Sequence, residues 1–271
     1  RFMHEPSTVV CASSNDWDFS LRYWSLHDNR YLRYLKGHRA KVVCVEVSPG
    51  EDRVVSASVD GTARLWDVRT DACAGLIKLK PSHGPAVQPN INFDDKGMVF
   101  AINTDASSIN LYDSRNYDRG PFETFRFEPD QIAACTALKF SSDGKYILVS
   151  GGECVWLVDS FSGAMVRGYR PSNPAYGAVL HASITPDTRH VIGGTAGGSL
   201  HFWRSLDLPP HLQNTIAPGQ EGEAAPGYVV REEVAVKHDR HVGPVNAVMC
   251  SKSTMLLVTA CKNTSFWIPD L

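Results

Sequence analysis

The sequence predicts an all-β fold, a β-propeller built from copies of one four-stranded sheet. The first observation is a strand ending that returns along the chain, with anchors at Trp24, Trp66, Tyr112, Val158, Trp203 and Trp267. Subtracting successive positions gives intervals of 42, 46, 46, 45 and 64 residues. The second is that short apolar runs alternate with turn residues between these anchors, as in hairpins. Intervals of about 40–45 residues are typical of propeller blades.

The clearest unit extends from Gly37 to Trp66 and its outer strand. We expect strands at 42–47, 53–58, 62–67 and 73–79. Ser48-Pro49-Gly50 supplies the first turn, and the sequence VDG at 59–61 supplies a tight hairpin turn. These features predict one complete four-stranded blade.

The other units follow the same order of apolar runs and turns. Their predicted strands are 89–93, 98–103, 108–113 and 122–127; 135–140, 146–151, 154–159 and 164–169; 180–184, 190–194 and 199–203; and 245–250, 255–261 and 264–268. The longest interval contains residues 205–228, which are rich in Pro, Gly and Glu. We expect a mobile loop inserted in one blade there, followed by that blade's outer strand at 229–236. The whole chain, 1–271, is then a single propeller domain.

Six units are visible, and the outermost two are incomplete. The run 8–13 occupies a second-strand position, and Trp267 lies in a third strand. Propellers close their ring so that no sheet edge is left open. We therefore expect a larger ring, with at least one blade and a closing strand upstream of Arg1.

Composition excludes several classes of protein. The formal net charge of −2 disfavours direct nucleic-acid binding through bulk positive charge. No apolar run approaches the roughly 18 residues that a membrane span needs. The seven cysteines are scattered without a CxxC pair, which is typical of buried thiols in a reducing compartment. No cofactor is predicted.

Four residues of the clearest unit have the spacing of a buried hydrogen-bond network. They are His38, Ser56 (with Ser58 as the alternative), Asp60 and Trp66. A histidine between a turn carboxylate and a serine hydroxyl gives each buried donor a partner. A Ser-His-Asp hydrolase would need a strained nucleophile turn and an oxyanion motif, and the sequence has neither. We therefore predict a structural network and no catalytic residues.

Two further motifs have weak functional interpretations. The glycine-rich run 193–198 precedes a strand and not a helix, so a hairpin turn is favoured over a phosphate-binding loop. His238 and His241 lack a third ligand in reach, so no metal site is predicted. His241 is expected in the turn-histidine position of the last blade.

Three residues are candidates for binding a partner protein. Trp17 lies in a turn between two strands, where it is expected to be exposed, and Trp is enriched in interface hot spots. Arg39 and Lys41 flank His38 and could receive an acidic or phosphorylated peptide. The alternatives are packing of Trp17 over a neighbouring loop and ordinary solvated charge for the two cations.

Longer strings resemble one nuclear WD-repeat family. They are SLHDNRYLRYLKGH (25–38), RGPFETFRF (119–127), LKFSSDGKYILVS (138–150) and TACKNTSFWIPDL (259–271). The family is the small propeller subunit of the COMPASS histone methyltransferase, which also serves the protein phosphatase 1 and cleavage/polyadenylation assemblies of transcription termination. The resemblance implies seven blades and a non-catalytic nuclear adaptor. Its implied partners are a methyltransferase subunit, a phosphatase-targeting scaffold subunit and the phosphorylated tail of RNA polymerase II.

Two other functions remain open from the sequence. One is a generic cytoplasmic WD-repeat adaptor, for example in ubiquitin ligation or trafficking. The other is an enzyme that uses a central channel, which would need convergent carboxylates or metal ligands. The sequence contains no such spaced cluster.

Overall fold

The computed structural model describes residues 1–268 except 14, 16, 80–87, 106, 128–134, 152–153, 172–175, 206–228, 231–240 and 252–255. The chain divides into two compact units, Arg1–Pro129 and Asp130–Leu271, and each is described by itself. The one helix that is described over its full length is the short 3-10 helix η1 (Tyr117–Arg119). None of the described helices has the length and apolar content to cross a membrane. The prediction of an all-β fold is confirmed.

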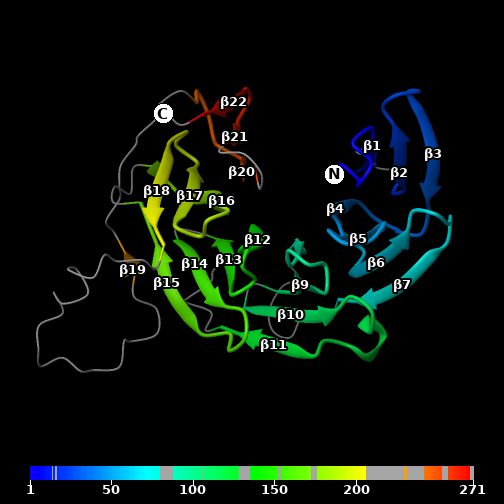
Figure 1. Ribbon diagram of the computed structural model, residues 1–271, viewed down its shortest axis with the longest axis horizontal. Helices are drawn as coiled ribbons and strands as arrows, with labels where there is room; N and C mark the ends of the chain where they lie inside the picture. The colour runs from blue at the N-terminus through cyan, green and yellow to red at the C-terminus, as the bar shows by residue number, and fades with distance from the viewer. Residues whose placement is uncertain are drawn as a thin grey trace, which may run out of the picture. The chain divides into compact units, whose positions relative to one another are not determined.

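The first unit contains three antiparallel sheets (Figure 1). The first sheet has the order β1-β2-β3, and the next two have four strands each, β4-β5-β6-β7 and β8-β9-β10-β11. Their bounds are β1 Thr8–Ala12, β2 Leu21–Ser25, β3 Arg30–Leu35, β4 Val42–Val47, β5 Arg53–Ser58, β6 Thr62–Asp67, β7 Cys73–Lys78, β8 Ile91–Phe93, β9 Val99–Asn103, β10 Ser108–Asp113 and β11 Glu123–Arg126.

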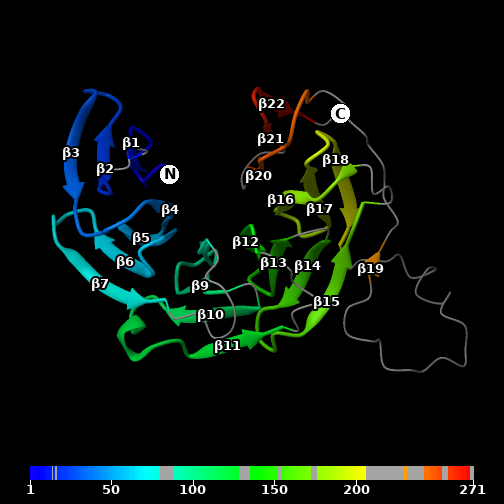
Figure 2. The same ribbon diagram turned by 180° about the vertical axis from the view of Figure 1, so that it is seen from behind.

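The second unit also contains three sheets (Figure 2). Their orders are β12-β13-β14-β15-β19, β16-β17-β18 and β20-β21-β22. Their bounds are β12 Ala137–Phe140, β13 Tyr146–Gly151, β14 Cys154–Asp159, β15 Met165–Tyr169, β16 Val179–Ile184, β17 His190–Thr195, β18 Leu200–Arg204, β19 Val229–Val230, β20 Ala247–Cys250, β21 Leu257–Ala260 and β22 Thr264–Trp267.

Successive sheets of the first unit share their hydrophobic cores. One cluster joins Val10 and Leu35 of the first sheet to Trp66 of the second. Another joins Leu65 of the second sheet to Phe100 of the third. Neighbouring residues of a strand point to opposite faces, so Leu65 and Trp66 bury the two sides of one sheet. The sheet β4–β7 is therefore held between its two neighbours.

The second unit is built on the same principle. Leu157 of β14 packs in one cluster with Trp203 of β18. On the next interface, Ile192 of β17 packs with Val248 of β20, and Trp267 lies against this cluster. All seven cysteines are free. Apolar contact between sheets, without disulfides, therefore provides the packing within each unit.

Six predicted strands have the predicted bounds: 42–47, 53–58, 62–67, 108–113, 146–151 and 154–159. The turn between β5 and β6 has Gly61 at φ 76°, a left-handed conformation that glycine adopts without strain. The extra loop expected at 205–228 lies, apart from Ser205, outside the described residues. The number of blades and the single domain over 1–271 remain predictions.

One strand differs from its predicted place. Val229 and Val230 were expected to begin the outer strand of the blade that contains β18, but β19 pairs in parallel with β15, at Gly168 and Tyr169. The physical reason is that the edge strand β15 has unpaired N–H and C=O groups, which any extended segment can satisfy. The order of the strands along the chain does not determine whether this segment pairs with the edge strand β15 or with the edge strand β18. The remainder of the predicted strand, 231–236, lies outside the described residues.

Candidate functional site

The structure brings together His38, Ser56, Asp60 and Trp66 at one end of the sheet β4–β7. His38 lies in the loop after β3, and its Nε2 is 2.7 Å from Ser56 Oγ, while its Nδ1 is 3.1 Å from Asp60 Oδ2. The Trp66 indole N–H donates to Ser56 Oγ over 2.8 Å. The alternative serine, Ser58, donates instead to the Ala40 carbonyl oxygen. Ser56, and not Ser58, therefore occupies the network position.

The direction of these hydrogen bonds fixes the state of the His38 ring. Since Trp66 can only donate, the Ser56 hydroxyl receives that bond and donates its own proton to His38 Nε2. The proton of the neutral imidazole is then on Nδ1, where it is donated to Asp60. Burial lowers the pKa of His38, the Asp60 carboxylate opposes this, and the nearby Arg64 charge adds to the lowering. His38 is thus held neutral as a relay between two buried groups.

Asp60, in the turn between β5 and β6, binds both the loop after β3 and the start of β6. Its carboxylate accepts hydrogen bonds from the backbone N–H groups of Arg39 and Thr62, and from the Thr62 hydroxyl. Burial alone would raise the pKa of the Asp60 carboxyl, but the hydrogen bonds from Thr62, Arg39 and His38 together lower it. The carboxylate therefore joins the loop after β3 to the start of β6.

The last sheet repeats this network with two substitutions. His241 Nε2 is 2.7 Å from Thr259 Oγ1, which also accepts the Trp267 indole N–H over 2.7 Å. The sulfur of Cys261 stands where Asp60 stands in the second sheet, 3.1 Å from His241 Nδ1. The sequence placed His241 in this position, but a thiol in place of the carboxylate was not foreseen. By contrast, the buried indole N–H of Trp203 has no hydrogen-bond partner.

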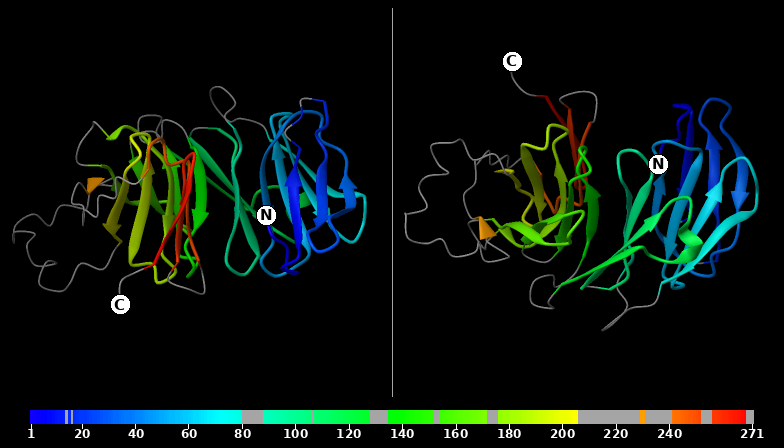
Figure 3. Two further views of the ribbon diagram at one scale, coloured as in Figure 1. Left: turned by 90° about the horizontal axis from the view of Figure 1, so that it is seen from above. Right: turned by 60° about the horizontal axis from the view of Figure 1, so that its bottom comes forward.

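Trp17, Arg39 and Lys41 lie on the same rim of the first unit. Register pairs Ala12 with Leu21 and Leu21 with Leu35, so the β1–β2 turn and the loop after β3 share one end of the first sheet. That loop leads into β4, and Figure 3 shows these strands running side by side between two rims. Trp17 is 80% exposed, and Arg39 and Lys41 are exposed.

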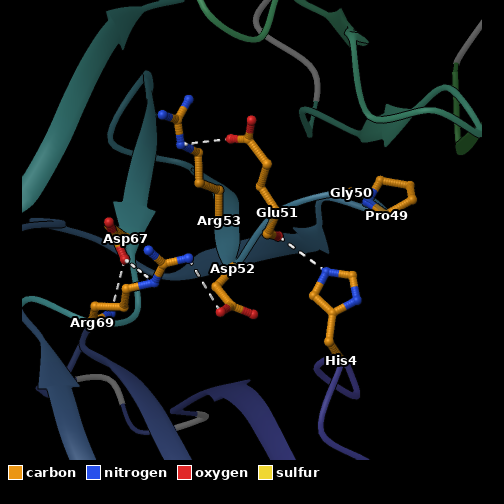
Figure 4. Close-up of a pocket in the computed structure, with 8 residues that line it drawn as sticks. All are labelled: His4, Pro49, Gly50, Glu51, Asp52, Arg53, Asp67 and Arg69. Atoms are coloured by element: carbon orange, nitrogen blue, oxygen red, sulfur yellow. Dashed lines mark hydrogen bonds and ion pairs between the residues drawn. The ribbon is translucent and has the colours of Figure 1, made fainter.

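The opposite rim of the first unit holds a polar pocket of about 510 Å³ (Figure 4). It is lined by His4, Pro49, Gly50, Glu51, Asp52, Arg53, Asp67 and Arg69. Arg53 pairs with Glu51 at 3.0 Å, and Arg69 lies 3.5 Å from Asp52 and 3.9 Å from Asp67. Each of these charged side chains is therefore in an ion pair, and the three carboxylates exceed the two arginines by one negative charge.

The two remaining motifs of the sequence are the glycine-rich run and the histidine pair. The run 193–198 extends from β17 into a hairpin turn before β18, and Gly198 has φ 85° there. In the part of the chain that the structure describes, no three His, Cys, Asp or Glu side chains are grouped to hold a metal ion. His238 lies outside the described residues.

Comparison with known proteins agrees with this architecture. Residues 29–67, which include the network, match the family described as "WD domain, G-beta repeat". The chain is 36% identical to WD repeat-containing protein 82 of Drosophila melanogaster over 270 residues, which cover 99% of this chain and 76% of that protein.

Two fungal relatives have names that describe an assembly. Identity is 35% over 168 residues with Set1 complex component swd2 of Schizosaccharomyces pombe, covering 60% of this chain and 45% of that protein. It is 29% over 220 residues with COMPASS component SWD2 of Saccharomyces cerevisiae, covering 76% and 62%. From the full-length match together with the repeated sheets, the chain belongs to the WD-repeat family that includes WD repeat-containing protein 82.

Proposed function

We propose that this chain is a non-catalytic scaffold subunit of a nuclear histone methyltransferase complex of the COMPASS type. The observation that carries the proposal is its similarity to two relatives named as components of the Set1 complex and of COMPASS. The buried network supports it, since the Ser56 hydroxyl is fully buried and is held between the Trp66 indole N–H and His38. What the fold then offers to partners is a set of turns on rigid sheets.

The finer part of the proposal is that the chain also serves protein phosphatase 1 and cleavage/polyadenylation assemblies, and docks the phosphorylated tail of RNA polymerase II. The rim with Trp17, Arg39 and Lys41 is the proposed docking surface. It combines an exposed aromatic anchor with two cations suited to anionic groups. A phosphatase-targeting scaffold subunit would bind through short segments in the same way.

The test is recovery of the tagged chain from nuclear extract, followed by mass spectrometry of the bound proteins. We expect methyltransferase subunits, and we expect Trp17→Ser to reduce their recovery by about tenfold or more. Phe161→Ser is the matched control, because Phe161 is 79% exposed on a turn of the second unit. Recovery of no methyltransferase or phosphatase subunit, or exclusion of the chain from the nucleus, would favour a cytoplasmic adaptor in ubiquitin ligation or trafficking.

A further inference from the structure

Arg64, on β6, lies beside the network. Its guanidinium group has no hydrogen-bond or ion-pair partner among the described residues, and its Nε is buried. The guanidinium lies against Gly37, where an added Cβ would be 2.5 Å from Nη1. A half-buried cation of this kind usually has an anionic neighbour, since desolvation of an unpaired charge is costly.

The first sheet shows what an arginine in this position does when an anion is available. Arg22 precedes Trp24 by two residues, as Arg64 precedes Trp66. Its Nη2 lies 2.7 Å from Asp18 Oδ2 in the β1–β2 turn. In the second sheet the turn between β5 and β6 is only three residues long, and its one carboxylate, Asp60, is engaged by His38, Arg39 and Thr62. The described residues thus supply a carboxylate to Arg22 and none to Arg64.

Two lysines lie near Arg64, one by strand register and one by its place in the sequence. Lys78 is paired in register with Thr62, which places it on the same face of the sheet as Arg64 and diagonal to it. Lys36 directly precedes Gly37. Both lysines are exposed, and neither forms an ion pair within the described part of the chain. Segments 36–41, 59–64 and 76–78 contain Asp60 as their one carboxylate.

We propose that Arg64, with Lys36 and Lys78, binds a carboxylate side chain from an acidic segment of a partner protein. The guanidinium can bind both oxygens of a carboxylate, as its planar fork favours, while the two ammonium groups attract neighbouring acidic residues. Gly37 is a positioning residue, because its missing side chain lets the guanidinium lie close to the backbone. The inference rests on the proposed function in taking the ligand to be a protein segment.

Fluorescence anisotropy of the purified chain tests this with a short labelled peptide rich in Asp and Glu. We expect Arg64→Gln to weaken binding by about tenfold or more, and the matched Asn/Gln peptide not to bind. Arg69→Gln is the control, because Arg69 is a paired arginine on the opposite rim. Gly37→Ala should also weaken binding, since its methyl group pushes the guanidinium aside while all charges are kept.

Several results would overturn the inference. One is equal peptide affinity for the native chain and Arg64→Gln; another is an equal loss in Arg69→Gln, which would indicate general charge attraction. Binding of the phosphoserine counterpart alone, without the acidic peptide, would show that the ligand class is wrong. If Arg64→Gln lowers the melting temperature, Arg64→Lys and Gly37→Ala decide the question. Because the assay uses the chain alone, its failure would leave recovery of the methyltransferase complex unaffected.

Discussion

At the scale of single residues, each donor in the network of the second sheet has one acceptor. Trp66 donates to Ser56, Ser56 to His38, and His38 to Asp60. These four residues can be nominated from sequence because a short hairpin turn fixes the register of the strands on either side of it. The lack of a described carboxylate beside Arg64 cannot be predicted from sequence in this way. It depends on which side chains lie near Arg64 in the folded chain.

Asp60→Ala tests the energetic weight of this network. Removal of the carboxylate leaves the His38 Nδ1–H and the backbone N–H groups of Arg39 and Thr62 without their acceptor. We expect the free energy of unfolding to fall by about 2–4 kcal/mol, measured by urea denaturation. Asp71→Ala is the control, because Asp71 is exposed and pairs only with Arg33. A loss below about 0.5 kcal/mol would mean that the network contributes little to stability.

At the scale of strands and sheets, the predicted bounds are correct where turn residues directly flank the apolar runs. The strands β4, β5 and β6 were predicted residue for residue, with Pro49 and Gly61 in the turns that separate them. β3 was missed as a strand because Arg30–Leu35 repeats Arg-Tyr-Leu, without the two-residue apolar alternation of a half-buried strand, and is largely exposed. β19 was misplaced because a two-residue edge pairing depends on which edge is near.

The last sheet offers a prediction at this scale. Cys261 receives the His241 Nδ1 contact and a backbone N–H from Asn263. A carboxylate accepts such hydrogen bonds more strongly than a thiol, so Cys261→Asp should stabilise the sheet β20–β22 by about 1 kcal/mol. Slower amide hydrogen exchange in β21 and β22 would reveal this. Cys250→Asp is the contrasting variant and should destabilise, because Cys250 packs against an apolar cluster. Faster exchange in Cys261→Asp would contradict the proposed equivalence of the two networks.

At the scale of the molecule, each unit has a sheet face that no other described sheet of the same unit covers. In the first sheet, register aligns Phe2, Val9, Trp24 and Tyr31 in one row across the strands. In the last sheet it aligns Met249, Val258 and Phe266. Contiguous exposed apolar surface of this kind favours association.

We therefore expect the chain to self-associate as its concentration rises. Phe266→Lys should shift the association to higher concentration, because Phe266 is 67% exposed at the outer end of its row. Sedimentation velocity across a concentration series measures this. Phe161→Lys adds the same charge at a phenylalanine that is 79% exposed on a turn, outside this row, and it should have a much smaller effect. A native chain that stays monomeric throughout the series would contradict the prediction.

The sharing of one apolar layer by two successive sheets also constrains how such a gene can change. A single inserted codon within β5 would exchange the residues on its two sides, and would turn Val54 and Val55 toward the wrong neighbours. Extra codons at a hairpin tip leave both layers intact. The gene can therefore vary in the length of its hairpin tips. A longer change in the sheets requires that all strands of one repeat be duplicated or deleted as a unit.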